Sequence, residues 1–168
     1  AGGQLAIGLV DKVEPLSIPL LAQALLGVGS DEQLNYEHPV YALLSTLTDV
    51  SDPTNYGHLI AADPIAGYAP KHVFMTQGLT DQYTPPKSME ALALAARIPI
   101  LEPAMSSFEA SAILGVPSAG VRAEGNLNGA TAALIQFNGG HFVAFDDVAR
   151  YQTQSFFETA LTGSPVIE

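Results

Sequence analysis

The chain has 168 residues, and 48% of them are hydrophobic, which is enough apolar material for one domain with a sizeable core. Its formal net charge of -11 disfavours nucleic acid and anionic membrane surfaces as partners. The absence of cysteine excludes disulfides, thiolate catalysis and cysteine-ligated zinc, and it leaves the compartment open. High acidity and few lysines slightly favour an exported or salt-adapted protein. No transmembrane segment is expected, because Pro19 and Gln23 interrupt the longest apolar stretch, around residues 16–28.

The first seventy residues are predicted to be mainly helical. Apolar residues recur at helical spacing in residues 1–13, 16–26 and 39–47. We expect the first of these helices to pack on a sheet. In residues 49–70, Asp-Pro and Ala-Pro pairs favour turns and short helical pieces. Residues 13–18 are the one candidate for a strand in this part.

The remainder of the chain alternates between predicted strands and helices. Residues 72–76 and 130–138 form apolar or β-branched runs, which predict buried strands. The predicted helices are residues 87–97 and residues 143–161, the latter beginning near Asp146 and Asp147, whose charges suit a helix N-terminus. Residues 99–128 are rich in glycine and proline and are predicted to be irregular, with one edge strand. The alternation predicts an α/β domain with a mostly parallel sheet.

Two short motifs carry the chemistry of this sequence. Asp81 lies in the stretch Gly-Leu-Thr-Asp-Gln-Tyr-Thr-Pro-Pro, and His141 lies in Gly-Gly-His-Phe. Each motif follows a predicted strand, and loops at the carboxyl ends of strands are where open α/β sheets hold ligands and reacting groups. The two motifs supply an acid and a base but no nucleophile.

The two motifs resemble loops of the α/β-hydrolase fold. The stretch HVFMTQGLTDQYTPP is similar to the penultimate strand and acid loop, and LIQFNGGHFVAF is similar to the last strand and histidine loop. The first three residues, Ala-Gly-Gly, resemble those that follow the serine in Gly-x-Ser-x-Gly-Gly. The resemblance covers about residues 1–13 and 71–161. Residues 99–128 would be an insertion, and the strand that normally precedes the cap is not clear.

The resemblance implies that the chain is the C-terminal portion of one α/β-hydrolase domain. Residues 1–13 would form the helix after the nucleophile elbow, residues 14–70 a helical cap or lid, and residues 71–168 the acid-loop and histidine-loop strands with the closing helix. The chain would then belong to a serine esterase or lipase that cleaves a carboxylic ester through a Ser-Asp-His triad. Asp81 would be the triad acid and His141 the base.

The resemblance also implies what the chain lacks. The serine would lie immediately before Ala1, whose N–H would contribute to the oxyanion hole. The N-terminal portion of the hydrolase, in the same or a separate chain, would therefore be a partner, and the isolated chain is expected to be inactive. An apolar ester such as a lipid is the expected substrate, because the apolar cap helices occupy the place of a lid. No metal or cofactor is expected.

Several alternatives remain open at the level of sequence. Asp81 could stabilise the turn of residues 80–85 and cap the helix that starts at Pro86, and His141 could be a turn residue with its ring in solvent. Ser118 is followed by x-Gly but lacks the preceding glycine that a nucleophile motif requires. No metal-ligand spacing links the remaining histidines, which are His38, His58 and His72.

Two other functions are compatible with the same motifs. A dehalogenase or haloperoxidase would use similar acid and histidine loops with a different nucleophile. A catalytically inactive, hydrolase-like binding module would use the apolar helices as its partner surface.

Overall fold

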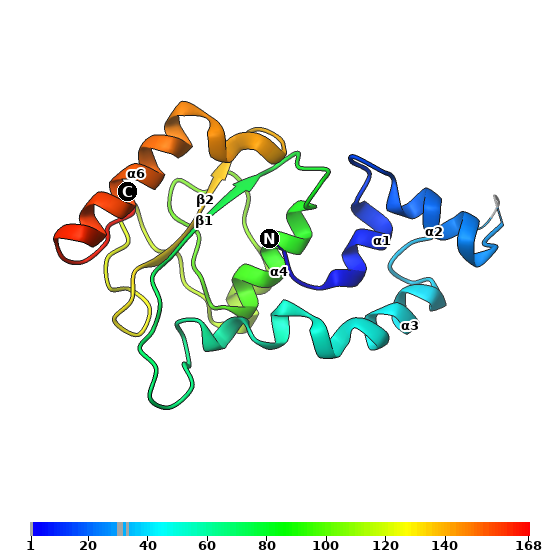
Figure 1. Cartoon of the computed structure of the whole chain (residues 1–168), viewed down its shortest axis with the longest axis horizontal. Helices are drawn as coiled ribbons and strands as arrows, with labels where there is room; N and C mark the ends of the chain where they lie inside the picture. Colours follow the sequence, from blue (N-terminus) through cyan, green and yellow to red (C-terminus); the bar gives the residue numbers. More distant parts are fainter. Residues whose placement is uncertain (1, 30–31, 33) are drawn as a thin grey trace.

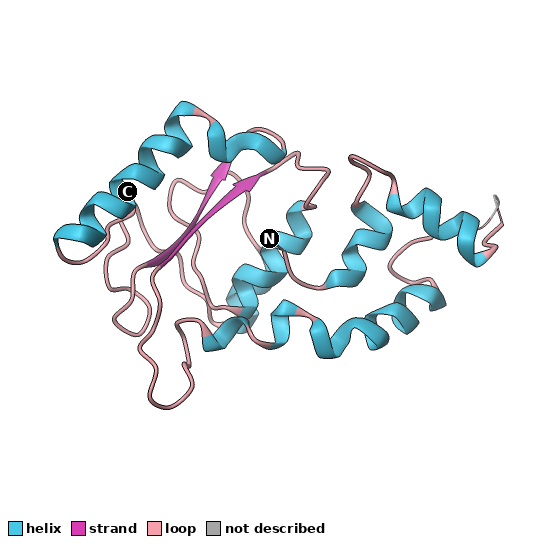
Figure 2. Cartoon of the chain, viewed as in Figure 1, coloured by secondary structure: helices cyan, strands magenta, loops and turns pink. Residues whose placement is uncertain are grey.

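A computed structural model describes residues 2–29, 32 and 34–168. Its sheet consists of two parallel strands, β1 (Val73–Gly78) and β2 (Ala132–Phe137), paired in register from Val73↔Ala132 to Gly78↔Phe137. Figure 2 shows the two strands side by side, pointing in the same direction, with helices around them. Helices and a parallel pair of strands are compatible with the α/β class, and both strands lie where the sequence predicts them.

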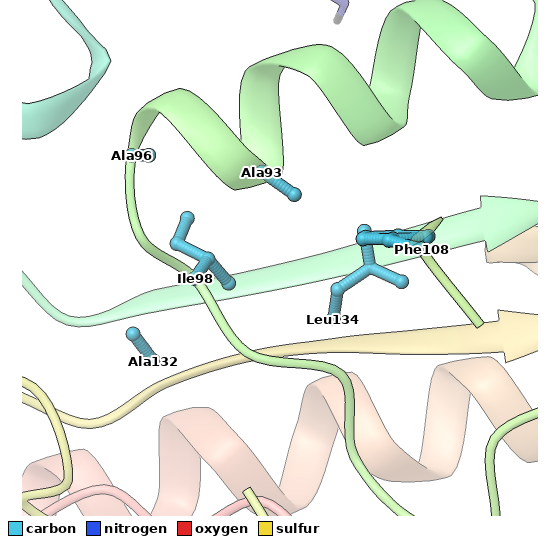
Figure 3. Packing of buried hydrophobic residues seen from close by; sticks show 6 residues of the cluster. All are labelled: Ala93, Ala96, Ile98, Phe108, Ala132 and Leu134. Carbon is cyan, nitrogen blue, oxygen red and sulfur yellow. The ribbon is translucent and has the colours of Figure 1, made fainter. Parts of the chain in front are cut away.

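A helix covers each face of the strand pair. Side chains alternate between the two faces of a strand, so Ala132 and Leu134 face α4 (Pro86–Ala95), whereas Ala133 and Phe74 face α6 (Asp147–Thr162). Figure 1 shows α4 and α6 on opposite sides of the strands. The cluster on the α4 side is drawn in Figure 3 and consists of Ala93, Ala96, Ile98, Phe108, Ala132 and Leu134.

The two edges of the strand pair differ. Residues 99–101 lie along β2, where Leu134 N donates to Pro99 O at 2.9 Å and Leu101 N donates to Leu134 O at 2.9 Å. In place of the edge strand predicted in residues 99–128, this segment forms an isolated parallel bridge, Ile100↔Leu134. The same region also contains a short helix that was not predicted, α5 (Glu109–Leu114), which ends at Gly115 with φ of 65°. Within the described part of the chain, β1 pairs with β2 alone.

The second and third helices of the first half lie where the sequence predicts them. Helix α2 (Ile18–Leu26) begins after Ser17, whose Oγ accepts from Leu20 N at 3.4 Å, and it ends at Gly27 with φ of 68°. Helix α3 (Pro39–Thr48) has proline at its first position, where the missing N–H is not needed. The predicted short helical pieces follow as η2 (Asp49–Ser51), η3 (Pro53–Asn55) and η4 (Gly57–Leu59).

Two predictions for the N-terminal region are wrong. The first helix covers residues 5–11 only, as η1 (Leu5–Ile7) and α1 (Gly8–Asp11), and its main neighbours are α2, α3 and α4 rather than a sheet, because α4 and α6 already cover the two strands. Residues 13–18 form no strand, since a bend occupies residues 14–16. No helix in the described ranges combines the length and apolar character that a bilayer crossing demands.

Candidate acid–base site

The loops that leave β1 and β2 are held together by their backbones. Leu79 N donates to Phe137 O at 3.0 Å, and Thr80 N donates to Gly139 O at 3.0 Å. Gly78 makes this close approach possible, because a Cβ atom there would lie 2.2 Å from Gly140 O. The strand ends therefore bring the two sequence motifs into contact.

The Asp81 carboxylate contacts both its own loop and the loop that carries His141. Its side chain is 8% exposed. Oδ1 accepts from Tyr83 N at 2.8 Å and from Thr84 N at 2.9 Å, while Oδ2 lies 3.0 Å from His141 Nδ1. The suggested turn-stabilising role is therefore present together with the contact to the histidine. The suggested helix-capping role is wrong, since Pro85 occupies the cap of α4 and no side chain bonds there.

The His141 ring lies between the acid loop and its own loop. His141 is the first residue of η5 (His141–Phe145), and its side chain is 37% exposed. Tyr83 stacks on the imidazole with ring centroids 4.7 Å apart and planes 15° apart, and Phe142 meets the imidazole edge-on at 5.1 Å. The imidazole is therefore fixed by contacts as well as by Asp81, rather than being a free turn residue in solvent.

A cavity of about 280 Å³ opens beside the imidazole. Its lining includes two carboxylates and two aromatic rings in addition to the glycine-rich turn, namely Glu14, Tyr83, Gly139, Gly140, His141, Phe142, Val143 and Asp146. Nε2 of His141 has no hydrogen-bond partner within the described ranges of the chain. The arrangement leaves one nitrogen engaged with a carboxylate and the other available to a reacting group.

Residues 12–14 contact the acid loop, which the sequence did not indicate. Val13 N and Glu14 N donate to Gln82 O at 3.2 and 3.1 Å, and Lys12 Nζ donates to Tyr83 O. The segment that follows α1 thus braces the loop that carries Asp81. No residue pattern signals these contacts, because they join parts of the chain about seventy residues apart.

A buried amide pair supports the same loops from the α4 side. Gln136 Nε2 donates to Gln77 Oε1 at 2.9 Å, and Gln77 Nε2 donates to Pro86 O at 3.1 Å. Gln136 Oε1 accepts from the N–H groups of residues 105 and 106, which ties residues 99–128 to the end of β2. Burial raises the pKa of the nearby Glu90 carboxyl, and a hydrogen bond from Gln77 and the charge of Lys87 offset only part of that rise.

The other candidate residues lie apart from the acid–base pair. Ser118 Oγ donates to Glu102 Oε1 at 2.9 Å and accepts from Gly120 N at 3.1 Å, which is a loop role and gives it no hydrogen bond to His141. Asp147 starts α6, whereas Asp146 also lines the cavity. Ala1, the expected oxyanion-hole residue, lies outside the described residues.

The remaining histidines have separate structural environments. His38 caps α3 by accepting from Val40 N at 3.2 Å, and His72 Nδ1 accepts from Thr131 N at 2.9 Å. His58 lies in η4. In the ranges that the structure covers, no group of three or more histidine, aspartate or glutamate side chains could hold a metal ion.

The contact between Asp81 and His141 determines which imidazole nitrogen can accept a proton. An ionised carboxylate only accepts hydrogen bonds, so the imidazole must present Nδ1–H to Asp81 Oδ2. The other nitrogen, Nε2, then carries the lone pair that can accept a proton. An imidazole held in this tautomer can take the proton of a hydroxyl group and later return it to a leaving group.

Comparison of the chain with protein-family models, curated proteins and solved structures gives no match. The function of this chain is therefore inferred from the geometry of the Asp81–His141 pair.

Proposed function

We propose that this chain supplies the acid and the base of a serine hydrolase of the α/β-hydrolase type that cleaves carboxylic esters. The observation that carries the proposal is the 3.0 Å contact between His141 Nδ1 and Asp81 Oδ2, made across 60 residues by loops that leave the carboxyl ends of adjacent parallel strands. An Asp–His pair in that position, with Nε2 facing no protein donor or acceptor in the described residues, matches the requirements of the triad.

In the proposed reaction, His141 acts first as base and then as acid. A serine hydroxyl is a weak nucleophile, so His141 Nε2 takes its proton as Oγ attacks the ester carbonyl carbon. His141 then donates that proton to the departing alcohol, and an acyl-enzyme remains. Water attacks the acyl-enzyme with the same histidine as base, which releases the carboxylic acid. Asp81 keeps the imidazole in the correct tautomer and stabilises the imidazolium.

The serine and half of the oxyanion hole are proposed to come from residues before Ala1 or from a separate chain. This part of the proposal is supported by the described residues, because none of their hydroxyl groups forms a hydrogen bond with His141 Nε2. Residues 4 and 5, near the start of the chain, are held by Asp52 next to α3, and residues 12–14 are held against the acid loop. A serine preceding Ala1 would therefore be connected to the acid loop through a short, braced segment.

An apolar ester is the proposed substrate. Helix α2 and its flanks expose five leucines and, from Leu16 to Gly29, carry no charged side chain; the leucines are Leu16, Leu20, Leu21, Leu25 and Leu26. Apolar surface of this kind suits contact with an acyl chain or another apolar group.

Hydrolysis of p-nitrophenyl esters by the protein, together with any residues that precede Ala1, tests the proposed function. We expect Asp81→Asn to lower kcat by about 10⁴, because an amide favours the wrong tautomer of His141, and His141→Gln to lower kcat at least as far. Asp147→Asn and His58→Gln are the matched controls, because neither side chain lies at the acid–base pair, and both should leave kcat within about twofold.

Other outcomes would point elsewhere. Full activity in Asp81→Asn and His141→Gln would overturn the roles of both residues. Halide release from haloalkanes with no ester hydrolysis would indicate a dehalogenase, and ligand binding without turnover would indicate an inactive binding module.

A further inference from the structure

We propose that Tyr83 is a positioning residue for the acid–base pair, and that its ring fixes the plane of the His141 imidazole. This role rests on the proposed function of His141 as base, although its physical test does not require catalysis. The starting observation is that the two rings stack with centroids 4.7 Å apart and planes only 15° apart.

The hydrogen bond to Asp81 cannot fix the imidazole plane by itself. The terminal torsion of a histidine side chain is broad, so rotation about the Cβ–Cγ bond can tilt the ring while a single hydrogen bond at Nδ1 adjusts. A flat ring lying parallel to the imidazole opposes that tilt. Asp81 therefore selects the edge that the imidazole presents, and Tyr83 sets the direction in which Nε2 points.

Tyr83 is itself anchored to the residues that it would position. Its N–H donates to Asp81 Oδ1 at 2.8 Å, while Asp81 Oδ2 contacts the imidazole. Tyr83, Asp81 and His141 thus form a closed set of contacts around one carboxylate. The backbone on the other side of Tyr83 is held by Lys12, whose Nζ bonds to Tyr83 O and lies 5.6 Å from the centre of the Tyr83 ring.

The ring rather than the hydroxyl of Tyr83 carries this role. The phenol oxygen makes no hydrogen bond in the described part of the chain. Phenylalanine at this position should therefore keep the stack, whereas leucine should lose it. Phe142 offers a matched comparison, because it contacts the imidazole edge-on, with ring planes 76° apart, and its own ring is 60% exposed.

The test is NMR of the intact protein labelled with ¹⁵N and ¹³C at histidine, with the His141 signals assigned by their loss in His141→Gln. In the unmodified protein we expect nuclear Overhauser contacts between the His141 and Tyr83 ring protons, and a protected Nδ1–H signal. In Tyr83→Leu, the His141 carbon-bound protons should move downfield as the shielding aromatic face is lost, and the Nδ1–H signal should broaden. Tyr83→Phe should restore both, and Phe142→Leu should change them much less.

Ester hydrolysis gives the second readout. Tyr83→Leu should lower kcat about tenfold to a hundredfold with KM within about threefold, because a misdirected base slows chemistry more than it weakens substrate binding. Tyr83→Phe should have nearly unchanged kcat.

Several results would overturn the role of Tyr83. One is an absence of Overhauser contacts between the two rings in the unmodified protein, a result that does not depend on any variant being folded. The other is a folded Tyr83→Leu protein whose His141 signals are unchanged. If the NMR expectations hold but the unmodified protein hydrolyses no ester, the positioning contact stands and the hydrolase function fails.

Discussion

At the scale of single residues, one buried carboxylate holds the start of the chain in place. Asp52 is 6% exposed and accepts from Gln4 N at 2.8 Å, Leu5 N at 2.6 Å, and both the N–H and the hydroxyl of Thr54. Burial alone would raise the pKa of Asp52. These hydrogen bonds together lower the pKa by more than burial raises it, so the net pKa is below its ordinary value. Asp52 thereby fixes the segment that, in the proposed enzyme, follows the nucleophile.

The lowered pKa of Asp52 predicts an acid-sensitive contribution to stability. Because the folded-state pKa is depressed, the stabilisation is complete above the ordinary value of 3.8 and is lost as the pH falls through the folded-state pKa. Urea unfolding from pH 7 to pH 2.5 should show Asp52→Asn to be less stable at pH 7, by about 1–3 kcal/mol, with the difference shrinking toward low pH. Asp63 is exposed, so Asp63→Asn is the control and should have the same free energy of unfolding as the unmodified protein at each pH. A loss of stability in Asp52→Asn that is the same at every pH would contradict this expectation.

The residues around the acid–base pair show how far sequence reasoning reaches at this scale. Asp81 and His141 could be predicted to meet, because each follows a strand and parallel strands end at the same edge. Tyr83 lies within the same motif, yet its stack on His141 depends on the side-chain direction, which the sequence does not specify. The contacts of residues 12–14 depend on the path of a chain with no regular structure, so no spacing could predict them.

At the scale of elements, the acid loop and histidine loop behave as one unit because their backbones touch. The contact occurs at Gly78, the last residue of β1, where any side chain would collide with the carbonyl oxygens of the histidine loop. β1 and η5 are in contact along this junction. The position of His141 relative to Asp81 therefore depends on Gly78, which is not itself part of the Asp81–His141 contact.

Gly78→Ala should separate the two loops. The added Cβ would lie 2.2 Å from Gly140 O and 2.7 Å from Gly139 O, so backbone must shift, at a cost of about 1–3 kcal/mol in the free energy of unfolding. In the proposed hydrolase, Gly78→Ala should also lower kcat for esters in the protein that remains folded, because the Asp81–His141 distance changes. Gly163→Ala is the matched control, since nothing lies within 4 Å of its Cβ position, and a Gly78→Ala protein with normal stability and activity would contradict the expectation.

The elements themselves were largely predictable, for local reasons. Both α2 and α3 have proline in the first turn, and α2 is followed by Gly27. β1 and β2 are apolar runs between turn residues. Helix α5 was missed because it has only six residues and lies between prolines and glycines that favour irregular structure. The predicted first helix extends beyond the observed one because the apolar spacing continues to Val13. Residues 12 and 13 instead contact the acid loop.

At the scale of the whole molecule, the strand pair is small for an α/β domain. In the described part of the chain, β1 leaves one edge without a strand, while residues 99–101 cover the corresponding edge of β2. In the proposed hydrolase, strands from the N-terminal portion would extend the sheet from β1. An open strand edge also favours association between chains. Because the proposed serine lies outside the 168 residues, we expect these residues alone to be inactive toward esters.

The most direct measurement is labelling of the protein, together with any residues that precede Ala1, with a fluorophosphonate probe, followed by mapping of the labelled peptide by mass spectrometry. We predict one labelled serine just upstream of Ala1, with labelling lost in His141→Gln and kept in His58→Gln. Labelling of Ser118 would contradict the proposed arrangement of the triad. A folded protein that takes no label at all would contradict the serine-hydrolase function itself.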